Sequence, residues 1–178
     1  YTDPILAARF SLFQTASIVT STGYGTVDFS LWPSLAVSLL FFGGLMGGCA
    51  GSTAGGLKVI RVWLMMKLSH REIKKLMHPA AVVTTKIGRK AVSDRVIEAV
   101  SGYIGAYVVV FALLVLGILA TGVDLETGFS ATASALNNLG PALGQAAAHY
   151  GEMPTASKYI LCLGMLLGRL EIFPILII

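Results

Sequence analysis

The stretch Gln14–Gly25, QTASIVTSTGYG, decides how this chain folds. It begins as a short apolar helical run and stops on Thr20-Ser21-Thr22-Gly23-Tyr24. Glycine permits backbone angles that other residues resist, and small hydroxyl residues beside it suit a chain that runs extended with its carbonyls turned towards a ligand. Rings of such carbonyls replace the hydration shell of a permeating cation. We therefore expect an ion-binding loop here, made by Ser21, Thr22, Gly23 and Tyr24.

A second stretch of the same kind lies at Ala131–Gly144, ATASALNNLGPALG. We expect a short helix over Thr127–Leu136, followed by the glycine-containing polar turn Asn137-Asn138-Leu139-Gly140-Pro141. Two short helices, each closing on a polar loop and each followed by a long apolar run, suggest a pore built from repeats. The predicted fold class is an all-α membrane protein of repeated span–pore helix–span units around a pore, with re-entrant filter loops.

The composition of the chain supports a membrane setting. Of its 178 residues, 55% are hydrophobic and only 12% are charged, whereas a soluble domain is about a quarter charged. An integral membrane protein is therefore expected. The chain opens on Tyr1-Thr2-Asp3-Pro4 and stops inside an apolar run at Ile178, so we also expect it to be part of a longer polypeptide.

Basic residues are concentrated in one segment. Ten of the thirteen Lys and Arg residues lie between Lys58 and Arg95, where the only acidic residues are Glu72 and Asp94. A basic segment beside membrane spans marks the cytoplasmic side. Nucleic-acid binding is the competing interpretation of a basic run, but interleaved aromatic residues are lacking, so no nucleic-acid partner is expected. The segment either docks something acidic, such as membrane lipid headgroups or a regulatory subunit, or acts only as a topological signal.

The helical run Ala7–Val19 is too short to cross a membrane. Its thirteen residues would span about 20 Å, whereas the hydrocarbon core of a bilayer is about 30 Å thick. The run is therefore expected to be re-entrant or interfacial, and its carbonyl end favours a cation in the pore. The acidic residues expected to concentrate cations at the outer mouth are Asp28, Asp124, Glu126 and Glu152.

The apolar stretch Ser30–Leu68 is too long for one straight span, because its 39 residues would form a helix of about 58 Å. Its middle, Gly43–Gly56, holds seven glycines, each costing about 1 kcal/mol in a helix relative to Ala. Every fourth residue from Gly43 to Gly55 is glycine, which also fits a stripe for close helix packing. A break is favoured over that stripe, since glycines lie on both faces. A mobile loop here would be a gate, formed by Gly47, Gly48, Gly51, Ser52, Thr53, Gly55 and Gly56.

Two longer apolar runs complete the pattern. Val96–Thr121 has 26 residues and is long enough to span a bilayer with some tilt. Thr155–Ile178 carries Arg169 about 20 Å along its length, where a charge is costly and points to an interior pathway. The alternative is an ion pair with another segment. A pair with Glu171 is disfavoured, because residues two apart do not face each other on a helix.

These residues resemble the Trk/Ktr/HKT superfamily of potassium-translocating subunits, most closely the bacterial TrkH type. The resemblance covers nearly the whole chain and rests on four stretches. They are Thr20-Ser21-Thr22-Gly23-Tyr24, Gly47-Gly48-Cys49-Ala50-Gly51-Ser52-Thr53-Ala54-Gly55-Gly56-Leu57-Lys58-Val59-Ile60-Arg61, Asn137-Asn138-Leu139-Gly140-Pro141 and Gly168-Arg169-Leu170-Glu171.

Such proteins carry four span–pore helix–span repeats in one chain, each giving one filter segment. The resemblance implies that this sequence holds the end of the third repeat and the whole fourth, and lacks the N-terminal repeats. The implied divisions are 1–29 (third pore helix and filter), 30–75 (its second span, broken by an intramembrane loop at 43–56), 76–95 (basic cytoplasmic loop), 96–122 (fourth-repeat first span), 123–154 (fourth pore helix and filter) and 155–178 (fourth-repeat second span).

The resemblance also implies roles for individual residues and partners. Backbone groups of Thr22, Gly23, Asn138 and Leu139 would bind K⁺, and Arg169 would face the pore beneath them. The implied setting is the cell inner membrane, with the basic segment 58–95 in the cytoplasm. The implied partners are a second copy in a homodimer and a cytosolic subunit that binds nucleotide.

Two classes of function follow from these expectations. The leading hypothesis is potassium uptake through a filter of backbone carbonyls, gated by the glycine loop. The alternative is a secondary transporter that binds a small solute at a discontinuous helix, which leaves two filter-like loops without a role. An intramembrane enzyme has little support, because the expected spans hold no carboxylate pair, Ser–His constellation or metal cluster.

Overall fold

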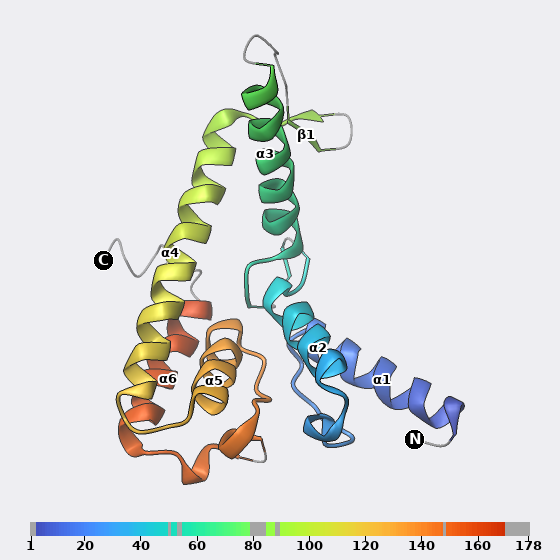
Figure 1. The fold of residues 1–178 in the computed structure, drawn as a ribbon, viewed down its shortest axis with the longest axis vertical. Coiled ribbons are helices and arrows are strands. Elements are labelled where there is room, and N and C mark those ends of the chain that lie inside the picture. The colour runs from blue at the N-terminus through green and yellow to red at the C-terminus, as the bar shows by residue number, and fades with distance from the viewer. Residues whose placement is uncertain are drawn as a thin grey trace.

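The computed structural model describes residues 3–49, 51–52, 55–78, 85–87, 90–147 and 149–169. Helices dominate this part of the chain (Figure 1). The helices are α1 (Pro4–Val19), α2 (Ser34–Met46), α3 (Val59–Met77), α4 (Asp94–Leu119), α5 (Leu125–Asn137) and α6 (Thr155–Arg169). Single 3-10 turns lie at Phe29–Leu31, Gly144–Ala146 and Tyr150–Glu152. An unexpected hairpin joins β1 (Lys86–Ile87) to β2 (Lys90–Ala91) in antiparallel register.

The helices form two groups that meet through a few contacts (Figure 1). In one group α4, α5 and α6 pack against one another, and in the other α1 packs on α2. Helices α3 and α4 rise side by side towards the end that carries the hairpin. Short helices from both groups therefore end near the middle of the molecule.

Helix α4 is the long span expected from the sequence. Within the described ranges it alone is a helix long and apolar enough to cross a membrane. It begins two residues earlier than expected, with Asp94 in its first turn, where a negative charge stabilises the helix dipole. It ends at Leu119, followed by a turn at Gly122 with φ of +89°.

Helix α5 is buried although it is short. Every residue from Ser130 to Asn137 is buried, and the residues there are mostly Ala, Ser and Thr, which let α4 and α6 approach closely. The carboxylate of Asp124 caps the helix by accepting the N–H of Thr127 at 2.9 Å. Its thirteen residues reach about 20 Å, too little to cross a bilayer.

In the first half of the chain, two boundaries differ from those expected. Helix α1 begins at Pro4 rather than Ala7, because Asp3 accepts the N–H of Ile5 and proline suits a first helical position. Gly43 and Gly44 belong to α2, so the glycine loop begins four residues later than expected. The last apolar run is described only to Arg169, and its expected continuation over 170–178 lies outside the described residues.

Candidate ion-conduction site

The first predicted loop folds back on the end of its own helix. After α1 ends, the N–H groups of Thr22 and Gly23 both donate to the carbonyl of Ser17, at 2.9 Å and 3.4 Å. Ser21 and Gly23 adopt positive φ, at 56° and 81°. The chain is thereby turned so sharply that it leaves the helix within three residues. A glycine at position 23 meets this backbone requirement without steric cost.

The second predicted loop has the same backbone arrangement, 117 residues further along the chain. The N–H of Leu139 donates to the carbonyl of Ser134 at 2.9 Å. Asn138 and Gly140 have φ of 54° and 97°, in the positions that Ser21 and Gly23 hold in the first loop. Each of these features recurs 117 residues later with nearly the same backbone geometry, which indicates that the two loops are copies of one structural unit. The tripeptide Thr-Ala-Ser precedes both loops, at 15–17 and 132–134, but it also occurs at 155–157 at the start of α6, so it does not by itself reveal the duplication.

The two loops meet each other. A Cβ atom placed on Gly23 would lie 2.5 Å from the carbonyl oxygen of Leu139 and 3.8 Å from the side chain of Pro141. A Cβ on Gly140 would lie 3.9 Å from the Cα of Gly23. The close approach therefore requires a residue without a side chain at position 23, whereas position 140 has room for one.

The predicted filter residues do not all lie on the same surface. A cavity of about 340 Å³ is lined by loop residues from both repeats and by α6. The loop residues that line it are Ser21, Thr22, Asn138, Leu139 and Gly140. The Tyr24 side chain instead points out and is 72% exposed, and Asn137 is fully buried and does not line the cavity.

Side chains of each short helix brace the chain that returns from its loop. The Ser17 hydroxyl donates to the carbonyl of Tyr24 at 2.6 Å. In the second repeat, the hydroxyl of Ser130 accepts the N–H of Leu143 at 3.0 Å, and that of Thr127 accepts the N–H of Gln145 at 3.0 Å. The sequence does not reveal these hydrogen bonds, because the hydroxyl of a helical Ser or Thr can equally bond to a backbone carbonyl of its own helix.

Asn137 connects the second loop to the rest of the core. Its side chain donates to the carbonyl of Ala133 at 2.7 Å and accepts the hydroxyl of Tyr107 at 3.0 Å. Gly55 lies so close that a Cβ there would overlap the carbonyl oxygen of Asn137. A Cβ on Gly56 would lie 2.6 Å from the side-chain oxygen of Asn137. The end of α5 thus touches the glycine loop directly.

The glycine loop breaks the long apolar stretch between α2 and α3, as predicted. Gly47 ends α2 with φ of 66°, and a Cβ there would lie 2.5 Å from the carbonyl of Gly55. The loop returns on itself, with the N–H of Val59 donating to the carbonyl of Gly48 at 3.3 Å. Of the predicted gate residues, Gly47, Gly55 and Gly56 are buried, Gly51 and Ser52 are exposed, and Thr53 lies outside the described residues.

Arg169 is the last described residue of α6, and it is exposed. The residue before it, Gly168, presses on the end of α5, since a Cβ there would overlap the carbonyl of Leu136. It would also lie 3.0 Å from the side chain of Asn138. Arg169 therefore follows directly on the point where α6 touches the second loop.

Two of the acidic residues predicted at the outer mouth, Asp28 and Asp124, have structural partners. Asp28 accepts the N–H and the hydroxyl of Ser30, and these hydrogen bonds hold the pKa of its carboxyl below the ordinary value of 3.8. The bond from Thr127 likewise lowers the pKa of Asp124. Both groups therefore stay ionised at neutral pH. Within the described part of the chain, no group of three His, Cys, Asp or Glu could hold a metal.

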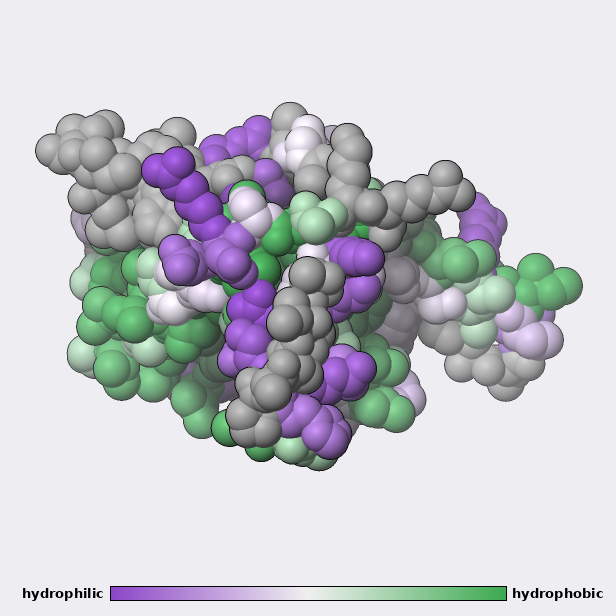
Figure 2. Space-filling model, turned by 90° about the horizontal axis from the view of Figure 1, so that it is seen from above, coloured by the Kyte–Doolittle hydropathy of each residue, from purple (hydrophilic) through white to green (hydrophobic). Residues whose placement is uncertain are grey.

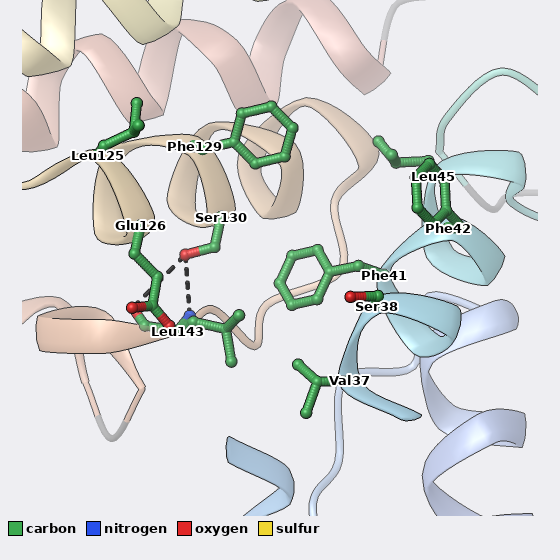
Figure 3. A pocket seen from close by; sticks show the side chains of 10 residues that line it. All are labelled: Val37, Ser38, Phe41, Phe42, Leu45, Leu125, Glu126, Phe129, Ser130 and Leu143. Carbon is green, nitrogen blue, oxygen red and sulfur yellow. Dashed lines mark hydrogen bonds between the residues drawn. The ribbon is translucent and has the colours of Figure 1, made fainter. Parts of the chain in front are cut away.

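An apolar cavity of about 560 Å³ lies between α2 and α5 (Figure 3). Phe41 projects from α2 and Phe129 from α5, and the bond between Ser130 and Leu143 lies at one side. The lining of this cavity is mostly apolar, with Ser38, Glu126 and Ser130 as its polar members, and it shares no lining residue with the cavity at the two predicted loops.

The repeated loops and the broken helix agree with one known family. The TrkH family, described as "Cation transport protein", matches residues 6–178. This chain belongs to the TrkH family. The family match and the structural likeness given next confirm the expected helical membrane fold, and the family is one of transport proteins rather than enzymes.

Individual relatives support the same conclusion. The Trk system potassium uptake protein TrkH of Halomonas elongata is 49% identical over 176 residues, which cover 99% of this chain and 36% of that protein. The protein of the same name from Escherichia coli K12 is 43% identical over 178 residues, covering 100% and 37%. The crystal structure of the potassium transporter TrkH from Vibrio parahaemolyticus matches with a TM-score of 0.92 and 49% identity, covering 99% and 38%. The chain thus spans little more than a third of the length of these TrkH relatives.

Proposed function

We propose that this chain supplies two of the filter segments through which an intact TrkH-family protein takes up potassium. The observation that carries the proposal is the meeting of two loops with the same backbone geometry at Gly23 and Leu139. Peptide oxygens that converge from repeated loops can replace the water around a monovalent cation. The ligands would be backbone groups of Thr22, Gly23, Asn138 and Leu139.

The repeats are assigned on the same basis. Residues 1–75 would be the end of the third repeat and 96–178 the fourth, with the N-terminal repeats completing the ring of filter segments. The glycine loop would obstruct the pore below the filter, since it lies against Asn137 at the end of α5. Arg169 would face the same passage.

The proposed surroundings follow from where the charge lies. Figure 2 looks onto the end of the molecule that carries the top of α3 and the hairpin, and hydrophilic residues gather there while hydrophobic residues lie at the sides. This end is formed by the basic segment 58–95, and we assign it to the cytoplasm. We assign the protein itself to the cell inner membrane. The proposed partners are membrane lipid, a second copy in a homodimer, and a cytosolic nucleotide-binding subunit that docks on the basic segment.

The test is a pair of serine substitutions in the intact subunit. Gly23→Ser and Gly140→Ser both force a side chain onto positive φ, and we expect both to raise sodium permeation relative to potassium. The effect should be larger for Gly23→Ser, because only that Cβ meets a carbonyl at 2.5 Å. Gly117→Ser on α4 is the control, since its Cβ would have ordinary contact with Ile160 at 3.4 Å.

Ion flux into vesicles, with sodium and potassium in competition, measures the ratio of sodium to potassium permeation. Unchanged discrimination in both filter variants would refute the filter assignment. The break between α2 and α3 is the one observation that favours the alternative, a transporter with a discontinuous helix. Binding of an anionic solute that is lost on Arg169→Gln would support that alternative.

A further inference from the structure

One carbonyl of the second loop already has a hydrogen-bond partner. The hydroxyl of Tyr150 donates to the carbonyl oxygen of Gly140 at 2.8 Å. Tyr150 lies ten residues further along the chain, at the start of the 3-10 turn Tyr150–Glu152, and its ring is partly buried against the core of α4, α5 and α6. Tyr150 and Gly140 both line the cavity of about 340 Å³ at the filter loops.

The turn that carries Tyr150 is anchored on both sides. The ammonium group of Lys158, on α6, donates to the carbonyl of Gly151 at 2.7 Å. Met153, directly after the turn, is 3% exposed and belongs to the hydrophobic core. The hydroxyl of Tyr150 is therefore held in place relative to α5 and α6, and it fixes the orientation of the Gly140 peptide.

The first loop differs at the equivalent point. Gly23 corresponds to Gly140, and the residue 117 positions before Tyr150 is Pro33, which has no donor group. Across the ranges that the structure describes, no side chain donates to the carbonyl of Gly23. Two loops with the same backbone geometry thus differ in whether this carbonyl is free to turn towards an ion.

We propose that Tyr150 is a positioning residue that sets ion specificity, because its hydroxyl keeps the Gly140 carbonyl out of the set of oxygens that bind the ion. This inference rests on the proposed filter. Selectivity depends on the number of coordinating carbonyls and on their freedom to move. A released carbonyl can turn inwards and adapt to the smaller sodium ion, so loss of the hydroxyl lowers discrimination.

The test is Tyr150→Phe in the intact subunit, which removes one oxygen and keeps the ring. We expect sodium permeation relative to potassium to rise about two- to tenfold, the range that corresponds to one neutral hydrogen bond. Potassium flux itself should persist. Tyr159→Phe is the matched control, because Tyr159 lies on α6 with 74% of its surface exposed, and it should leave the ratio unchanged.

A second variant keeps the proposal testable if Tyr150→Phe does not fold. Lys158→Met keeps the Tyr150 hydroxyl but removes the anchor of its turn, so we expect a smaller change of the same sign. If Tyr150→Phe folds and its sodium permeation relative to potassium is unchanged, the role of Tyr150 is overturned. If Tyr150→Phe does not fold, an unchanged ratio of sodium to potassium permeation in Lys158→Met overturns it. If Gly23→Ser still lowers selectivity in that case, the proposed filter stands and only this inference fails.

Discussion

At the scale of single residues, Asn137 has a role that its place in the sequence does not reveal. It was predicted as part of the filter loop, yet it is the last residue of α5 and is fully buried. Its side chain is held by Ala133 and Tyr107, and Gly55 covers its carbonyl. A buried amide needs partners for both its donor and its acceptor, and the bond from Tyr107 joins the end of α5 to α4.

The Tyr107→Phe variant tests this arrangement. Removal of the hydroxyl leaves the side-chain oxygen of Asn137 buried without its donor, which costs about 1–3 kcal/mol. We expect the intact subunit to unfold at a lower temperature, measured by thermal denaturation in detergent. Tyr159→Phe should leave the unfolding temperature unchanged, and equal stability of the two variants would show that Tyr107 does not support Asn137.

At the scale of elements, apolar length predicts which helices are long and which are short, and glycine content predicts that a break exists but not where it starts, since Gly43 and Gly44 are helical. The length of α4, the shortness of α1 and α5, and the break after α2 all follow from the number of apolar residues available. The braces from Ser17, Ser130 and Thr127 could not be predicted, because they depend on where the returning chain lies. The hairpin at Lys86–Ala91 was missed because its strands are only two residues long.

The cap of α5 leads to a prediction about pH. The pKa of Asp124 is lowered in the folded protein by hydrogen bonds from Thr127. Its stabilising effect is therefore fully present above the ordinary pKa of 3.8 and is lost as the pH falls through the lower, folded value. We expect the unfolding temperature of Asp124→Ala to fall less than that of the native protein on acidification below about pH 4.

Asp124→Asn serves as the control for the cap. Asparagine keeps an acceptor for the helix N–H but has no charge to titrate. Asp124→Asn should be more stable than Asp124→Ala at neutral pH. Both variants lack the titrating carboxylate, so on acidification the unfolding temperature of each should fall less than that of the native protein. Identical acid profiles in the native protein and both variants would contradict the assigned cap.

At the scale of the whole molecule, the two repeats depend on each other. The glycine loop follows the first predicted loop in the sequence, yet it rests on the end of α5, which leads into the second. The two predicted loops also meet directly, since Gly23 faces Leu139. A movement of the glycine loop would therefore displace Asn137, the residue from which the second loop starts.

Shortening the glycine loop tests its proposed role as a gate. Deletion of Gly51 and Ser52, which are exposed, removes the tip and spares the buried contacts of Gly55 and Gly56. We expect potassium flux through the intact subunit to rise, because an obstruction has been reduced, while discrimination against sodium is unchanged. A deletion variant that folds and conducts no faster would exclude the gate role.

The carbonyls of Ser17 and Ser134 each accept hydrogen bonds from the loop that follows them. A substitution outside the contact between Gly23 and Leu139 can therefore alter one segment of the proposed ring while the other loop keeps its own hydrogen bonds. Preference among monovalent ions can then shift in small steps during evolution, by changes in one copy of a duplicated unit. A filter built from four identical subunits lacks this freedom, since every change there is made four times at once.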